Sequence, residues 1–166
     1  MLKLKDFDEI KKEIYRLEKL EADRSSKWQI FCVVREIFDE NGQKVEERCE
    51  AKEFLLDEAS KDDLERIVAY FDLFAEQGPP PTTKFFRHAK GFKKEEKRLQ
   101  ELWNVADLYL CECKPIGKNL YRLLGCYSRQ RKFLVLVSGF KKPPEKRFRQ
   151  ECERAINILK RLKEDD

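Results

Sequence analysis

The last third of the chain contains two apolar strand patterns joined by a short polar segment, and this constrains the fold more than any other feature. Residues 119–128 and 131–138 are rich in Leu, Val and Tyr. Two such runs so close together predict an antiparallel hairpin. The second run continues into Gly139-Phe-Lys-Lys142, and a helix is expected over about 145–163. The hairpin should therefore bring Arg122, Lys141 and Lys142 to one part of a sheet.

The preceding residues predict helices and strands in a mixed order. Apolar residues at helical spacing predict a helix over 6–21. The remaining expected elements are a strand over 28–38, a tight turn at Asn41-Gly42, a returning strand and a short helical turn near 54–56, a helix from the capping box Ser60–Asp63 to Gly78, a loop and short helix over 82–100, and a strand over 105–114. This order predicts an α+β fold.

Charge is distributed unevenly along the 166 residues. Residues 1–83 contain 14 Lys and Arg against 21 Asp and Glu, whereas residues 84–166 contain 22 against 11. A basic half favours a nucleic-acid partner, although two helices with solvated charged faces would give the same totals. No apolar run is long enough for a membrane helix and the N-terminus does not resemble a signal peptide. We therefore expect a cytoplasmic protein with no membrane partner.

The six cysteines do not have the spacing of a zinc site, and His88 is the only histidine. We expect buried free thiols, with Cys111 and Cys113 on one face of a strand. The sequence predicts no metal and no cofactor.

Three segments, in order, resemble the RelE/HigB superfamily of toxins, nearest to its phage-derived HigB-like branch. They are a helix ending at Gly78-Pro79, the Leu120-Tyr-Arg-Leu-Leu124 strand, and Leu134-Val-Leu-Val-Ser-Gly-Phe-Lys-Lys142. The resemblance covers about residues 28–163. It implies a RelE-like domain over 27–166, built as a small twisted antiparallel sheet with helices packed on one face. Residues 1–26 are then an N-terminal helical extension.

The resemblance also implies an activity. It implies an endoribonuclease that cuts messenger RNA, often on the ribosome, and that an antitoxin protein usually blocks. Because the sequence has no clustered set of metal ligands, we expect this activity to be metal-independent. Arg122 matches the position of the catalytic arginine, and Lys141 or Lys142 matches a basic residue that contacts the scissile phosphate. Lys114, Arg87, His88 and Tyr121 are expected to bind substrate.

Each of these assignments has a structural alternative. An arginine suits a phosphate, but Arg122 could instead form an ion pair with a carboxylate such as Glu112. Lys141 and Lys142 could be a solvated turn. Glu112 could be a general base, whereas a lone loop histidine such as His88 is more often simply exposed. Phe85 and Phe86 could stack on bases or fill the core.

The chain also departs from the family. Leu110 and Glu112 occupy positions where some members have lysines, and Phe148 lies near the position of a tyrosine. These substitutions support a second hypothesis, a catalytically weak or inactive relative that binds RNA or a protein partner. A third is inhibition of DNA gyrase, as in the related ParE toxins.

Overall fold

A computed structural model describes residues 12–20, 26–116, 121–141 and 145–164. The elements in chain order are β1 (Lys12–Lys19), β2 (Gln29–Phe38), β3 (Lys44–Arg48), α2 (Glu50–Glu58), α3 (Lys61–Gln77), β4 (Phe86–His88), α4 (Lys93–Trp103), β5 (Tyr109–Cys113), β6 (Tyr121–Ser128), β7 (Phe133–Lys141) and α5 (Glu145–Glu164). The fold is therefore α+β, as expected. Within the described ranges, no helix has both the length and the apolar content needed to span a membrane.

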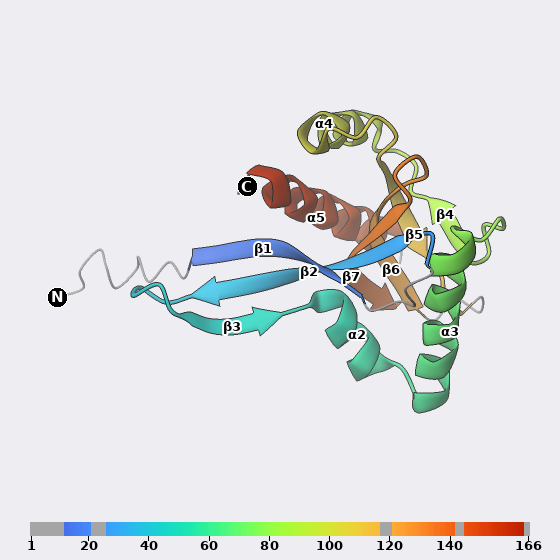
Figure 1. The fold of residues 1–166 in the computed structure, drawn as a ribbon, viewed down its shortest axis with the longest axis horizontal. Coiled ribbons are helices and arrows are strands. Elements are labelled where there is room, and N and C mark those ends of the chain that lie inside the picture. The colour runs from blue at the N-terminus through green and yellow to red at the C-terminus, as the bar shows by residue number, and fades with distance from the viewer. Residues whose placement is uncertain (1–11, 21–25, 117–120, 142–144, 165–166) are drawn as a thin grey trace.

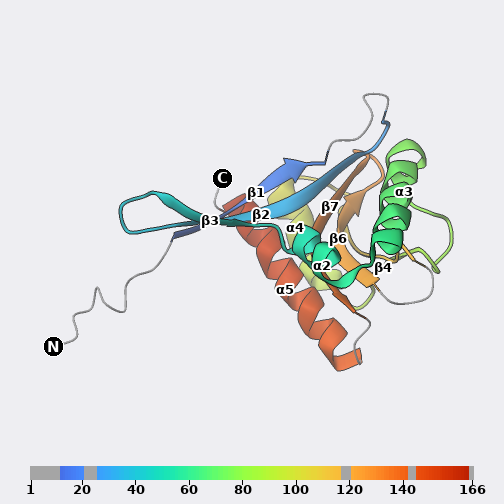
Figure 2. The same ribbon diagram turned by 90° about the horizontal axis from the view of Figure 1, so that it is seen from below.

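The strands form one mixed sheet of seven strands in the order β1-β2-β7-β6-β5-β4, with β3 paired to β2 outside this path. β2 runs parallel to β7, and every other pair is antiparallel. The first half of β2 pairs with β7 and its second half pairs with β3. The β2–β3 hairpin consequently projects from the rest of the molecule (Figure 1, Figure 2).

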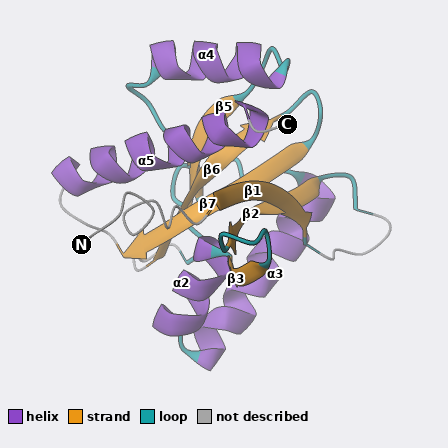
Figure 3. Ribbon diagram, turned by 90° about the vertical axis from the view of Figure 1, so that its left-hand side faces the viewer, coloured by secondary structure: helices purple, strands orange, loops and turns teal. Residues whose placement is uncertain are grey.

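Helices cover both faces of the sheet (Figure 3). On one face, α4 and α5 pack on apolar side chains of β5, β6 and β7. On the other face, α2 and α3 pack on the alternate residues of the same strands, among them Cys111, Cys113 and Leu123. Strands buried on both faces are apolar almost throughout, which explains the continuous hydrophobic runs of β6 and β7.

The structure corrects three expectations about the fold. The helix expected over 6–21 is wrong for residues 12–19, which form β1; residues 1–11 lie outside the described part of the chain. β1 pairs with β2 over its whole length, and Tyr15 and Leu17 pack on the α5 side. Tertiary pairing has overridden the helical spacing. The sheet is also larger than expected and mixed rather than antiparallel, and its helices do not lie on one face.

Several local signals are confirmed. The Ser60 side chain accepts a hydrogen bond from the Asp63 N–H (3.1 Å) and caps α3, which ends at Gly78 with a φ of 81°. At Asn41-Gly42 the chain turns between β2 and β3, and Gly42 has a φ of 79°. The expected hairpin is β6–β7.

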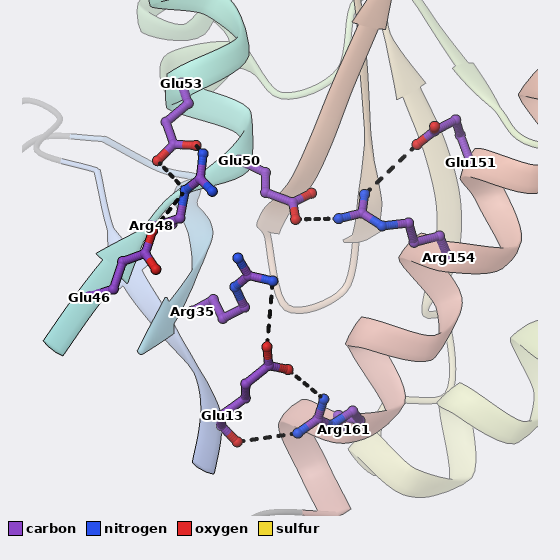
Figure 4. A network of polar contacts seen from close by, with 9 residues as sticks. All are labelled: Glu13, Arg35, Glu46, Arg48, Glu50, Glu53, Glu151, Arg154 and Arg161. Carbon is purple, nitrogen blue, oxygen red and sulfur yellow. Dashed lines mark hydrogen bonds and ion pairs between the residues drawn. The ribbon is translucent and has the colours of Figure 1, made fainter. Parts of the chain in front are cut away.

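Ion pairs connect the β1–β3 region to α2 and α5 (Figure 4). Glu13 of β1 contacts Arg35 (3.6 Å) and Arg161 of α5 (3.3 Å). Arg154 of α5 pairs with Glu50 at the start of α2. These contacts connect α5 to β1 and to the start of α2.

Candidate functional site: a cationic groove beside β4

A groove with a volume of about 1010 Å³ lies along the edge of the sheet formed by β4. Its charged lining consists of five cationic side chains, Arg87, Lys90, Lys114, Arg122 and Arg129, and one carboxylate, Glu112. Its aromatic lining consists of Phe86, Tyr127, Phe140, Phe148 and the imidazole of His88. The excess of positive charge over aromatic walls suits a ligand that carries both anionic and planar groups.

The centre of the groove is an Arg–Glu–Arg arrangement built on three adjacent strands. Arg87 of β4 is opposite Glu112 of β5 in the strand register. Arg122 of β6 lies on the same face, two residues from the partner of Glu112. Glu112 Oε1 accepts a hydrogen bond from Arg122 Nε (2.5 Å), and its Oε2 accepts from Arg87 Nε (2.8 Å) and Nη2 (2.7 Å). A single carboxylate thus holds two guanidinium groups.

Burial differs sharply among these three side chains. The side chain of Glu112 is 2% exposed and that of Arg122 is 6% exposed, whereas Arg87 is 44% exposed. Burial lowers the pKa of Arg122, the charge of Glu112 opposes this, and the charge of Arg87 lowers it further. Arginine remains protonated under such conditions. The groove therefore has a fixed positive charge at its base and a more accessible one at its rim.

Arg87 is held from a second direction by α5. Its guanidinium lies over the ring of Phe148, with a distance of 5.4 Å to the ring centroid. Cation–π contacts of this kind stabilise the position of an exposed arginine. Phe148 also packs edge-on against Phe140 (6.1 Å between ring centroids), which lines the same groove.

His88 is fixed at the end of β4 by a buried carboxylate. Its Nε2 lies 2.7 Å from Glu96 Oε2, which also accepts a hydrogen bond from the N–H of Leu110 (2.9 Å). In the strand register, His88 lies opposite Cys111 and therefore on the other face of the sheet from Arg87. His88 and Arg122 line different parts of the groove.

A row of aromatic rings continues from His88. Its ring lies edge-on to Tyr109 (5.2 Å), Tyr109 lies 6.2 Å from Tyr127, and Tyr127 lies 5.0 Å from Phe86. The guanidinium of Arg129 is over the Tyr127 ring at 5.7 Å. Tyr109 is the most exposed large ring of the row, at 37%.

Two of the residues predicted to take part in the site, Lys141 and Tyr121, do not line this groove. Lys141 forms an ion pair with Glu58 (2.8 Å), and both side chains are exposed. The hydroxyl of Tyr121 donates to Asp63 (2.8 Å) on the α2–α3 side, the face opposite Arg122. Lys142 lies outside the described residues. Of the other predicted residues, Lys114, Arg87, His88 and Arg122 do line the groove.

Sequence reasoning missed β4 and the residues that complete the groove from a distance. Arg129 belongs to the β6–β7 turn and Phe148 to the first turns of α5. The one available signal was the basic and aromatic run Phe85-Phe-Arg-His88, which contains all of β4.

The described residues contain no group of three or more His, Cys, Asp and Glu side chains arranged to hold a metal ion. No protein-family model matches the chain, and no curated protein has a significantly similar sequence.

Proposed function

We propose that the groove binds the sugar–phosphate backbone of RNA and that the protein is a toxin-like, metal-independent endoribonuclease acting on messenger RNA. The observation that carries the proposal is the buried Arg122, held by Glu112 at the base of a groove with five cationic side chains. Ribosome association and neutralisation by an antitoxin protein belong to the same proposal, because they follow from the RelE/HigB resemblance.

Arg122 suits the chemistry of cleavage by a ribose 2′-hydroxyl. The attack gives a phosphorane-like transition state with more negative charge on its non-bridging oxygens than the starting diester has. Cationic donors held in place before the reaction stabilise such charge without reorganising. Glu112 accepts a hydrogen bond from Arg122 Nε, and Arg122 Nη1 donates to the backbone carbonyl of Tyr121 (3.4 Å), so the guanidinium is held in place in the lining of the groove.

The positions of the resembling segments support this proposal. Their described residues fall on α3, on β6 and on β7. α3 and the β6–β7 pair lie next to each other through the cluster that includes Phe74 and Leu123. A RelE-like core would then consist of α3, β5–β7 and α5, with β1–β3 as an addition to it.

One observation favours a second candidate, an RNA-binding protein without nuclease activity. Both oxygens of Glu112 accept hydrogen bonds from guanidinium groups, so this carboxylate is poorly suited to remove a proton from a 2′-hydroxyl. Its role in either candidate is to position Arg87 and Arg122. The two candidates share the groove and differ only in whether RNA is cut.

The test combines binding and cleavage of the same RNA. A 5′-labelled single-stranded RNA is titrated with the full chain at several salt concentrations, and its products are resolved on a gel with EDTA present. We expect binding that weakens steeply with salt, because phosphate contacts release counterions, and cleavage that persists in EDTA. Binding without cleavage selects the second candidate, and absence of binding at low salt rejects both.

A charge-reversal pair makes the test specific to the groove. Arg129→Glu changes a groove cation, whereas Arg98→Glu changes an exposed arginine of α4 that does not line the groove. Both variants alter the net charge equally. We expect Arg129→Glu to reduce RNA affinity about tenfold or more and Arg98→Glu to have a much smaller effect. Equal effects would indicate attraction by net charge alone.

A further inference from the structure

Cys32 and Cys49 form a pair of adjacent thiols where the β2–β3 hairpin meets α2. Arg35 of β2 is opposite Arg48 of β3, and Cys49 follows directly. Continuing this antiparallel register puts Cys32 and Cys49 on the same face. Both side chains pack in the hydrophobic cluster under α2 and α3, and their thiols are hydrogen-bonded to each other.

The two thiols differ in exposure. Cys49 is partly exposed, whereas Cys32 and the other four cysteines are buried. Cys49 is also the N-cap residue of α2, where backbone N–H groups favour a negative charge. An oxidant can therefore reach Cys49 but not Cys32 directly.

The pKa values of the two thiols are shifted in opposite directions. The hydrogen bond with Cys32 lowers the pKa of Cys49 to about 7. Burial opposes this shift, whereas the backbone N–H groups of Lys52 and Ala51 and the positive charge of Lys52 reinforce it. The same hydrogen bond, together with burial, raises the pKa of Cys32. Cys49 is thus the thiol that ionises near neutral pH, and Cys32 is the one that retains its proton.

Ion pairs on both sides fix the backbone around Cys49 (Figure 4). Arg48 contacts Glu53 of α2 through Nε (3.2 Å) and Nη2 (3.1 Å). Glu50 pairs with Arg154 of α5. Cys49 lies between these two anchored residues, so its thiol is kept beside Cys32.

We propose that Cys49 is an oxidation-sensitive modification site that forms a disulfide with Cys32 after reaction with a peroxide. The Cys49 thiolate attacks one peroxide oxygen, the O–O bond breaks, and the other oxygen leaves and takes up a proton. Cys49 becomes a sulfenic acid. The sulfur of Cys32 then attacks the Cys49 sulfur; the S–S bond forms, the S–O bond breaks, and water carries away the oxygen and the Cys32 proton. The peroxide gains the two electrons that the two thiols lose.

Cys111 and Cys113 provide an internal comparison. They also lie two residues apart on one face of β5, but both are buried, and burial raises the pKa of Cys111. Residues two apart in a strand are separated by roughly 6.6 Å along it, more than the Cβ–Cβ distance of about 3.8 Å in a disulfide. This second pair should remain reduced under conditions that oxidise Cys49.

The experiment treats the folded full chain with hydrogen peroxide, counts free thiols and maps disulfides by mass spectrometry. We expect the count to fall from six to four, with a single bridge between Cys32 and Cys49. Cys49→Ser should keep all five of its thiols, and Cys32→Ser should stop at a Cys49 sulfenic acid that dimedone captures. Cys152→Ala, which changes a buried thiol elsewhere, should still lose two.

The proposal is overturned by retention of all six thiols, by a bridge between any other pair, or by loss of two thiols in Cys49→Ser. A measurement on the unmodified chain covers the case in which a variant does not fold. Alkylation of the folded protein at pH 7.5 should label Cys49 at least tenfold faster than Cys152, and equal rates would contradict the assignment of Cys49 as the reactive thiol.

Discussion

Arg122 and Glu112 form a buried ion pair on neighbouring strands, with 2.5 Å between Nε and Oε1. The sequence suggests two roles for Arg122, a phosphate ligand or the structural partner of Glu112. The structure contains the ion pair and also places Arg122 in the lining of the groove. Substitutions at these positions should therefore affect stability and, under the proposed function, RNA binding together, and each effect needs its own measurement.

Glu112→Gln should lower the free energy of unfolding by about 3 kcal/mol, because it leaves a buried guanidinium without its counterion. Urea denaturation followed by circular dichroism measures this change. Glu58→Gln is the matched control, since the Glu58–Lys141 pair is exposed and should contribute less than about 1 kcal/mol. Similar losses in the two variants would mean that burial of the Arg122 pair does not matter for stability.

Arg122→Lys tests the functional role with the charge retained. A lysine has no planar fork and cannot hold Glu112 and a phosphate at the same time. We expect the variant to fold and its RNA cleavage rate to fall by a factor of about 100 or more, in the range for loss of one transition-state donor. Arg98→Lys serves as the control. A folded Arg122→Lys protein that cleaves at the unmodified rate would remove Arg122 from the mechanism.

Local sequence signals predicted the elements that form from nearby residues. The capping box at Ser60, the turn at Asn41-Gly42 and the β6–β7 hairpin are all present. β1 was predicted as a helix because Ile14, Leu17 and Leu20 have helical spacing, yet strand pairing with β2 decides its conformation. Such pairing depends on contacts that local periodicity does not contain.

The candidate site also combines residues that local sequence signals identify with residues that only the tertiary fold brings together. Arg122 stood out in the sequence because it is the one charged residue within an apolar strand pattern, and Glu112 was recognised as its possible partner. Arg129 and Phe148 reach the groove only because the β6–β7 turn and α5 fold back toward β4. Tyr121, adjacent to Arg122, was assigned to the site although the alternation of a strand places it on the opposite face.

Asp107→Asn should reduce the acid sensitivity of the fold. Asp107 accepts hydrogen bonds from Ser128 Oγ (2.6 Å) and the Gln130 N–H (2.9 Å). Partial burial raises its pKa, but these hydrogen bonds outweigh burial and leave it below the usual value of 3.8. A depressed pKa contributes stability that is present above the unfolded pKa and is lost as the pH falls through the folded one.

The measurement is the unfolding free energy of both proteins between about pH 5 and pH 2, an interval that brackets the titration of the Asp107 carboxyl group. The unmodified chain should lose the Asp107 contribution below about pH 4, and the difference between the two proteins should shrink there. A difference that stays constant over the whole interval would contradict this role.

Gly125→Ala should strongly destabilise the β6–β7 pairing. A Cβ atom at this position would lie 1.8 Å from the carbonyl oxygen of Val135, which is backbone and cannot move aside without breaking the ladder. We expect a loss above about 2 kcal/mol, typical of severe overpacking. Gly42→Ala is the control: its Cβ meets nothing, so only the positive φ of 79° contributes, at about 1 kcal/mol. Urea denaturation of the two variants measures both losses. A loss for Gly42→Ala as large as that for Gly125→Ala would contradict the steric argument.

Tyr109→Ala should weaken binding of single-stranded RNA without changing its dependence on salt. Tyr109 is the most exposed large ring of the row that links His88 to Tyr127, so it is the ring of this row on which an unpaired base is expected to stack. Base stacking on an aromatic ring contributes about 1–3 kcal/mol, which corresponds to a loss of affinity of about fivefold or more. The ring carries no positive charge, so its removal should leave the slope of log affinity against log salt unchanged. Leu73→Ala, which truncates an exposed apolar residue of α3, is the control and should bind normally.

Comparison of single-stranded and duplex RNA sharpens the test, because paired bases are not available for stacking. Unchanged affinity for single strands, or an equal loss for both RNAs, would show that bases do not stack on this row.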